Sequence, residues 1–456
     1  MRFLLLPFFM AALLPGLPAR RLTNDPALQI HSLMENPEEI LRFDPGSAPS
    51  AGDAVKIGAG DLYNDEKGYG ILPSGDMPVA IDRGGSGPGR DFLTGSHPFS
   101  LALKLPEGKY EVCLTLGDPG GSSETTVKAE SRRLMLENVK TRKGRLVTKK
   151  IVVDVRTPRI HPTGEIRRKE RELDYLNWDD KLTLEFAGRR PCIAYLEIKK
   201  TTDLPVIYLA GNSTVTDQER EPWASWGQML PRFLKPEVAV ANYAESGESL
   251  LSFKREKRLE KILSIIKPGD WLFVEFAHND QKPGGNHVDA FTTYKEELKF
   301  FIGAARNKGA QPVLVTSMHR RRFDDNGKII NTLEDYPEAM CQTAREENVP
   351  CIDLNGMSKI LFEALGPEES KKAFVHFPPN SFPGQTEPLA DDTHFSNYGA
   401  YLLARCVVES IRREIPVLSR FLLPAIRSFN PARPLPFNRF RVPASGMYAP
   451  GKPEGS

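Results

Sequence analysis

From Leu204 onward the chain alternates short apolar runs with longer stretches of helical spacing. This alternation predicts a parallel, doubly wound sheet with helices on both faces. We expect the domain to span residues 204–420. The expected strands are 205–210, 238–243, 271–276, 311–316 and 350–354, and the expected helices are 249–266, 291–308, 333–348, 356–365 and 396–413.

Residues 25–200 follow a different pattern, and a length of 456 residues already favours two domains. Runs such as 99–103, 110–114 and 181–186 alternate apolar and polar residues, with turns rich in Gly, Pro and Asp between them. Such alternation predicts an antiparallel sandwich or jelly roll. This part contains no catalytic cluster.

The two ends of the chain lie outside these domains. Met1-Arg2 precedes an apolar stretch that small residues and Arg20-Arg21 follow. These features predict a signal peptide over residues 1–22 and a secreted or periplasmic protein, with an uncleaved anchor or a wrongly assigned start of the chain as the alternatives. The stretch is too short for a membrane span, which needs roughly 20 apolar residues. Residues 430–456, rich in Pro and Gly, are predicted to form an extended arm.

Charge and cysteine content exclude several classes of partner. The 61 basic and 59 acidic residues nearly balance, so we expect no nucleic acid partner and no membrane contact beyond the signal peptide. The five cysteines define no disulfide framework and fit no zinc site. We expect buried free thiols, with a Cys341–Cys351 pair as the alternative. No cofactor is expected, and the sequence leaves the oligomeric state open.

Residues capable of nucleophilic catalysis follow the predicted strands. Ser213 and Asn279 each come directly after an apolar run, and Gly247 lies shortly after another. In doubly wound sheets ligands bind beyond the carboxyl ends of the strands, so these residues are expected at one site. A serine nucleophile needs a base, and that base needs a group that fixes its tautomer. His394 and Asp391 can fill these two roles.

The four blocks that contain these residues resemble the motifs of the SGNH (GDSL-like) hydrolases, and within them the rhamnogalacturonan acetylesterase group. The blocks are Gly-Asn-Ser-Thr at 211–214, Ser-Gly-Glu-Ser at 246–249, His-Asn-Asp at 278–280 and Asp-Asp-Thr-His at 391–394. They occur in the family's order, over about residues 204–413. The resemblance implies a flavodoxin-like, three-layer fold. The site residues that it implies are Ser213 as nucleophile, His394 as base, Asp391 as acid, and an oxyanion hole made by the backbone N–H groups of Ser213 and Gly247 and the amide of Asn279.

The resemblance also implies an activity and a partner. The chain would be a secreted serine esterase that removes acetyl groups from a plant cell-wall polysaccharide, above all pectic rhamnogalacturonan, through an acyl-enzyme. Asn212 and Ala277 stand where the family usually has Asp and Gly, and we expect these departures to tune the site. A broader acyl esterase or lipase is one alternative. A catalytically silent glycan-binding protein on the same scaffold is another.

Substrate contacts are predicted from aromatic and basic residues near these blocks. Trp223 and Trp226 can stack on sugars, although their spacing equally fits a helix that packs on a core. His319 and Arg320 begin a basic run after an apolar strand, and guanidinium groups pair well with uronic acid carboxylates. The alternative for this run is a solvated loop. The front domain resembles galactose-binding-like sandwiches, either as a glycan-binding module or as a structural wedge.

Each catalytic assignment has a plainer alternative. Ser213 can be a helix N-cap, and His394 can be a structural histidine. Asp392 competes with Asp391 for the role of acid, although the D-x-x-H spacing, which in the family places acid and base on one loop, favours Asp391. His278 is expected to pack beside Asn279 without a catalytic role. Asp391, Asp392 and His394 can also bind a divalent ion, but no second His or Cys cluster accompanies them, and we predict no metal.

Overall fold

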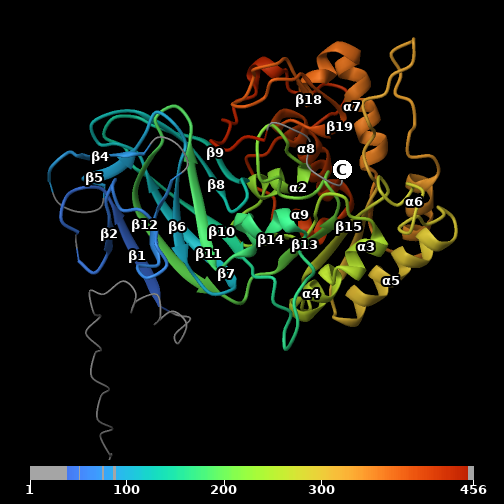
Figure 1. Ribbon diagram of the computed structural model, residues 1–456, viewed down its shortest axis with the longest axis horizontal. Coiled ribbons are helices and arrows are strands. Elements are labelled where there is room, and N and C mark those ends of the chain that lie inside the picture. Colours follow the sequence, from blue (N-terminus) through green and yellow to red (C-terminus); the bar gives the residue numbers. More distant parts are fainter. Residues whose placement is uncertain (1–38, 51, 74–76, 86–88, 450–456) are drawn as a thin grey trace, which may run out of the picture.

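A β-rich part stands beside an α/β part in the computed structural model, which describes residues 39–50, 52–73, 77–85 and 89–449 (Figure 1). The predicted signal peptide, residues 1–22, lies outside the described residues. Across the described ranges no helix is long and apolar enough to cross a membrane.

The β-rich part consists of two sheets around a shared apolar core. Its strands are β1 (Ile40–Pro45), β2 (Val55–Ile57), β3 (Tyr69–Leu72), β4 (Val79–Asp82), β5 (Asp91–Thr94), β6 (Phe99–Lys104), β7 (Gly108–Leu116), β8 (Ser123–Ala129), β9 (Arg133–Thr141), β10 (Val147–Val155), β11 (Lys181–Ala187) and β12 (Cys192–Thr201). One sheet has the order β10-β7-β12-β1-β2, with β5 beside β12 and β4 beside β5, and the other is β3-β6-β11-β8-β9. All pairs are antiparallel except β1 with β2. Alternation along the strands creates the core, since Val112, Leu114 and Leu116 of β7 are fully buried and the residues between them are less so.

The α/β part is built on a parallel sheet with the order β14-β13-β15-β16-β17. Numbered within this sheet the order is 2-1-3-4-5, the flavodoxin-like arrangement. All five strands form within a few residues of the predicted ranges, and their carboxyl ends share one edge. Their bounds are β13 (Val206–Gly211), β14 (Ala239–Asn242), β15 (Trp271–Glu275), β16 (Gln311–Val315) and β17 (Cys351–Ile352).

Helices cover both faces of this sheet, because successive strand residues point to opposite sides (Figure 1). Tyr208 and Leu272 face a core shared with α3 (Leu250–Arg255), α4 (Arg258–Ile265), α5 (Thr293–Asn307) and α6 (Tyr336–Glu347). Leu209 and Phe273 face the opposite core, which contains α2 (Trp226–Met229), α7 (Leu354–Glu369), α8 (Asn397–Glu414) and α9 (Pro416–Ser419). The three-layer arrangement therefore follows directly from the strand pleat.

Two helices differ from their predicted ranges. The predicted helix 249–266 is divided into α3 and α4, because Lys257 adopts a left-handed conformation with φ of +62°. The predicted helix 356–365 becomes the longer α7, which is kinked at Gly366, where φ is +73° and Pro367 follows.

All five cysteines are free, as the sequence analysis favoured. The sulfurs of Cys341 and Cys351 lie 3.5 Å apart without a bond between them. Cys192 and Cys406 are buried, and the other three are partly exposed.

The hairpin tip, which comprises the turn 130–132 between β8 and β9 and Arg133 at the start of β9, inserts into the α/β part. Its two arginines form buried ion pairs there, Arg132 Nη2 with Glu221 Oε1 at 2.6 Å and Arg133 Nε with Asp217 Oδ2 at 2.7 Å. Ser131 adds a hydrogen bond from its hydroxyl to the Glu219 carboxylate. The tip therefore holds the loop that follows Ser213.

The described part of the predicted C-terminal arm packs across both parts of the molecule. It has almost no regular structure, since only Phe437–Arg439 form a short helical turn, η5. Ser445 is buried, and its hydroxyl donates to Glu185 Oε1 of β11 at 2.9 Å while its N–H donates to Glu221 Oε1 at 2.9 Å. The segment therefore contacts the β-rich part at Glu185 and the α/β part at Glu221.

The ion pair of the hairpin tip predicts a large loss of stability on Arg133→Met. The substitution leaves the Asp217 carboxylate buried without its cation, which typically costs about 3–5 kcal/mol. Lys140→Met is the matched control, because Lys140 forms an exposed pair with Glu124 on the same strands, worth less than about 1 kcal/mol. Denaturant unfolding of both variants checks this, and equal losses would contradict the assignment.

Candidate active site

Ser213 lies in a tight turn directly after β13. The N–H groups of Val215 and Thr216 donate to Asn212 O, both at 3.0 Å, and Asn212 Oδ1 accepts from Thr214 N at 3.0 Å and Thr214 Oγ1 at 2.8 Å. Asn212 thus supplies the acceptor oxygen that closes the turn, a bond that an aspartate oxygen can also accept. No helix begins at Ser213, since α2 starts at Trp226, so the N-cap interpretation is wrong.

The structure brings Ser213, His394 and Asp391 into one hydrogen-bonded chain. His394 Nε2 lies 2.9 Å from Ser213 Oγ, and His394 Nδ1 lies 2.7 Å from Asp391 Oδ2. The second oxygen of Asp391 accepts from the N–H groups of Thr393 at 2.8 Å and His394 at 3.0 Å. His394 is 1% exposed. A serine hydroxyl in this geometry can pass its proton to the imidazole, which the carboxylate orients.

Asp391 and His394 lie on a strand, and not on the loop that the resemblance implied. They belong to β19 (Leu389–Phe395), which pairs antiparallel with β18 (Phe374–Phe377), and the register shifts between Phe374 and Val375. Asp392 turns away from the imidazole of His394. It contacts Arg321 Nη1 and His376 Nε2, each at 2.7 Å, so it does not compete with Asp391.

The two other predicted blocks meet beside this chain. Asn279 follows β15, and its amide Nδ2 donates to Glu248 O at 2.9 Å. Gly247, in the loop after β14, has φ of +83°, a conformation that glycine adopts without strain. Asn279 lines a pocket together with Ser213, and its amide ties the segment after β15 to the loop after β14 that contains Gly247.

A pocket of about 140 Å³ opens onto Ser213 and His394. Two predicted site residues, Asn279 and Arg320, also line it. Its remaining lining residues are His278, Lys282 and Thr393. Lys282 was missed, although its position three residues after Asn279 at a strand end offered a signal. No group of three or more His, Cys, Asp or Glu side chains that could hold a metal ion occurs within the described ranges.

The pKa values of Asp391 and His278 are both shifted, for different physical reasons. Burial alone would raise the pKa of Asp391, but the hydrogen bond and charge of His394, with two backbone N–H groups, hold that pKa well below its usual range. Burial, together with the positive charge of Arg320, holds the pKa of His278 far below its ordinary value. Asp391 is therefore an anion and His278 a neutral imidazole at neutral pH.

Three predicted substrate contacts are wrong. Trp223 and Trp226 are 1% and 0% exposed, and Trp226 belongs to the apolar core beneath the sheet. Buried rings cannot stack on a sugar, so the alternative, helix packing, holds for Trp226. His319 is 3% exposed and does not line the pocket, and burial lowers its pKa to about 4.

The three-layer α/β fold, with Ser213, His394 and Asp391 hydrogen-bonded at the carboxyl edge of its sheet, is the arrangement of an α/β hydrolytic enzyme. Comparison with known proteins identifies the family. Residues 209–401 match the GDSL-like Lipase/Acylhydrolase family. The rhamnogalacturonan acetylesterase RhgT of Bacillus subtilis (strain 168) is 47% identical over 207 residues, 45% of this chain and 88% of the relative. The probable rhamnogalacturonan acetylesterase YesY of the same strain is 41% identical over 210 residues, 45% of this chain and 92% of that protein.

A third relative extends over the β-rich part. The uncharacterized esterase YxiM of B. subtilis is 28% identical over 393 residues, 82% of this chain and 91% of its own. A crystal structure of that protein aligns at 27% identity with a TM-score of 0.43, covering 82% of this chain and 98% of the other. The chain belongs to the GDSL-like lipase/acylhydrolase family and is a carboxylic ester hydrolase.

The buried carboxyl of Asp280 predicts a pH dependence of stability. Burial raises its pKa to about 7, and Asp280 Oδ1 accepts from Leu250 N at 2.8 Å. An unfolded aspartate titrates at about 3.9, so between these values the folded state binds a proton that the unfolded state has lost. The stabilisation is present below about pH 4 and is lost as the pH rises through 7.

The free energy of unfolding should therefore decrease less with rising pH in Asp280→Asn than in the wild type, since the amide keeps the acceptor oxygen and cannot ionise. Urea unfolding at pH 5 and pH 8 measures it, with exposed Asp325→Asn as the control. An unchanged difference between the two pH values would contradict the assignment.

Proposed function

We propose that this ester hydrolase is a serine acetylesterase that acts on a plant cell-wall polysaccharide, most specifically pectic rhamnogalacturonan. The observation that carries the proposal is the hydrogen-bonded chain from Asp391 through His394 to Ser213, beside a small pocket that Ser213 and His394 line. The names of the similar Bacillus proteins support the choice of acetyl ester and polymer.

The reaction proceeds through an acyl-enzyme. Ser213 Oγ attacks the acetyl carbonyl carbon while His394 Nε2 takes its proton, and Asp391 holds the resulting imidazolium. As the C–O bond to the sugar breaks, His394 gives the proton to the leaving sugar oxygen, which frees the alcohol and leaves acetyl on Ser213. Water then attacks the acetyl carbonyl carbon while His394 takes its proton. The bond between this carbon and Ser213 Oγ breaks, His394 returns the proton to Ser213 Oγ, and acetate is released. The backbone N–H groups of Ser213 and Gly247 and the Asn279 amide stabilise the oxyanion of both tetrahedral intermediates.

Pocket size and charge support a small acyl group on an acidic polymer. A pocket of about 140 Å³ suits acetyl better than the long chain of a lipid, which favours an acetylesterase over the lipase alternative. The guanidinium of Arg320 and the ammonium of Lys282 line the same pocket. Cations at this position suit the carboxylate of a neighbouring uronic acid.

We assign the remaining segments around this activity. Residues 1–22 direct the chain to the exterior or periplasm, and residues 204–420 form the catalytic domain that meets the polysaccharide. The sandwich, residues 25–200, with its galactose-binding-like pattern, acts as a structural wedge. The buried hairpin tip on the loop after Ser213 supports this role over a glycan-binding module. Within the predicted arm, residues 430–449 brace the two.

Ser213→Ala is expected to abolish acetate release from acetylated rhamnogalacturonan, and Asn279→Ala to lower kcat by roughly 100 to 1000-fold. Acetylated xylan and a long-chain aryl ester are measured beside the pectic polymer. Activity of the wild type confined to the long-chain ester would indicate a lipase. No activity on any ester would favour the silent glycan-binding alternative, and unchanged turnover in either variant would remove that residue from the site.

Arg320→Met is expected to raise KM for the acidic polymer by roughly 10-fold or more, since a charged hydrogen bond is worth about 1.5–3 kcal/mol. KM for an uncharged aryl acetate should not change. Arg322→Met is the matched control, because Arg322 is an exposed neighbour outside the pocket. An equal rise in KM for both esters, or for both variants, would contradict a uronate-binding role.

A further inference from the structure

Two cations from outside the catalytic domain bind the same carbonyl oxygen in the loop after β14. They come from a segment between β10 and β11, where the short helix η1 (Glu170–Asp174) lies. Lys169 Nζ donates to Ser246 O at 2.8 Å, and Arg171 Nη2 donates to the same oxygen at 2.8 Å. One backbone carbonyl thus receives two charge-assisted hydrogen bonds, which are among the stronger kinds in proteins.

Buried carboxylates hold both cations in place. Glu245 Oε1 accepts from Arg171 Nε at 3.2 Å and Arg171 Nη2 at 2.8 Å, and the Glu248 carboxylate accepts from Lys169. The side chains of Glu245 and Glu248 are 3% and 0% exposed. Because the carboxylates flank Ser246 in sequence, the cations are fixed over its carbonyl.

The backbone of the segment is fixed in turn. Glu172, which is fully buried, accepts from Lys169 N at 2.8 Å and from Trp178 Nε1 at 3.1 Å, and it pairs with Arg258 of α4. Contacts between the β-rich part and α4 therefore fix the positions of Lys169 and Arg171.

The carbonyl that these cations bind belongs to the peptide unit whose nitrogen is Gly247 N. A peptide unit is planar, and in the trans form its C=O and N–H point in opposite directions. Fixing Ser246 O therefore fixes the direction of the Gly247 N–H. Positive charge at the oxygen also withdraws electron density through the resonance of the amide, which makes the N–H a stronger donor.

We propose that Lys169 and Arg171 are positioning residues for oxyanion stabilisation, which orient and polarise the Gly247 N–H through the carbonyl of Ser246. The inference rests on the proposed role of Gly247 as an oxyanion donor. Lys169 also supports the second donor, because the residue that it binds, Glu248, accepts the Asn279 amide at its carbonyl oxygen. The β-rich part of the chain thereby contributes to the chemical step without touching the substrate.

The test uses the full-length protein carrying Lys169→Met, Arg171→Met and both together, with an aryl acetate that has no sugar. We expect kcat to fall by roughly 10-fold in each single variant, less than the 100 to 1000-fold typical of losing a donor outright, with KM nearly unchanged. The inhibition constant of a trifluoromethyl ketone, which forms an oxyanion on the serine, should rise in parallel. Lys169→Arg and Arg171→Lys should restore part of kcat.

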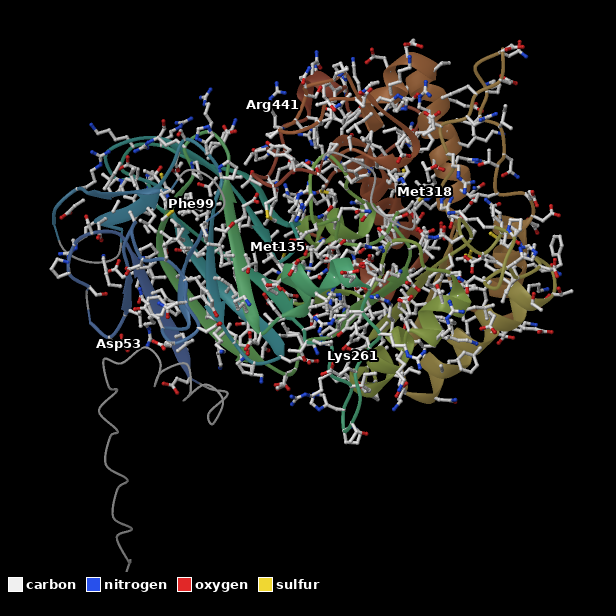
Figure 2. The ribbon with its side chains drawn as sticks, in the orientation of Figure 1. Asp53, Phe99, Met135, Lys261, Met318 and Arg441 are labelled. Carbon is white, nitrogen blue, oxygen red and sulfur yellow. The ribbon has the colours of Figure 1, made fainter. Side chains whose placement is uncertain are left out.

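Lys261→Met is the matched control, because Lys261 joins the same two parts through other groups. Its Nζ donates to Glu107 Oε1 at 2.6 Å and to Arg159 O, and Figure 2 labels it at the lower side of the junction. This variant should lower the melting temperature and leave kcat unchanged. If the double variant does not fold, as judged by circular dichroism, the two single variants carry the test.

Parallel losses of kcat and inhibitor affinity at constant KM support the proposal. Unchanged kcat in folded Lys169 and Arg171 variants overturns it, as does an equal loss of kcat in Lys261→Met. A failure of the proposed function is separate, because it would appear as full activity in Ser213→Ala. If Asn279→Ala loses activity and the Lys169 and Arg171 variants keep theirs, the positioning role alone is overturned.

Discussion

The hydrogen bond between Ser213 and His394 joins residues 181 positions apart, and the surrounding structure brings them together. Ser213 is held by a fully buried strand and a turn closed by Asn212. His394 is carried to it by β19 and by the start of α8, where Gly399 packs on Ala373. A Cβ at Gly399 would lie 1.9 Å from Ala373 O, so close packing of this helix requires glycine. Serine and base therefore meet through backbone constraints that the core enforces.

The β-rich part holds both loops that flank the serine. Its hairpin tip binds the loop after β13 through Arg132 and Arg133, and its η1 segment binds the loop after β14 through Lys169 and Arg171. Buried charges are unfavourable unless each has a partner, so these contacts define one relative position of the two parts. This arrangement supports the proposed role of the sandwich as a structural wedge.

The sequence predicted the parts of the structure that depend on local patterns. Strand and helix order follow from apolar periodicity, and the motif blocks located Ser213, Asn279 and the D-x-x-H residues that the structure brings to one edge. Burial of Trp226 was not predictable, because the spacing between Trp223 and Trp226 does not show whether other helices or the sheet cover the ring. Lys169 and Arg171 lack any motif, and their role depends on contacts with residues more than 70 positions away. Long-range contacts of this kind leave no mark on local sequence.

Direct trapping of the acyl-enzyme tests the central claim that Ser213 is the nucleophile of an acetylesterase. The protein is mixed with an acetylated substrate, quenched in acid within one turnover, digested and analysed by peptide mass spectrometry. We expect one acetyl group on Ser213, formed transiently and absent from Ser213→Ala. Hydrolysis without a label on that residue, or a label elsewhere that forms and decays at the rate of turnover, would contradict it.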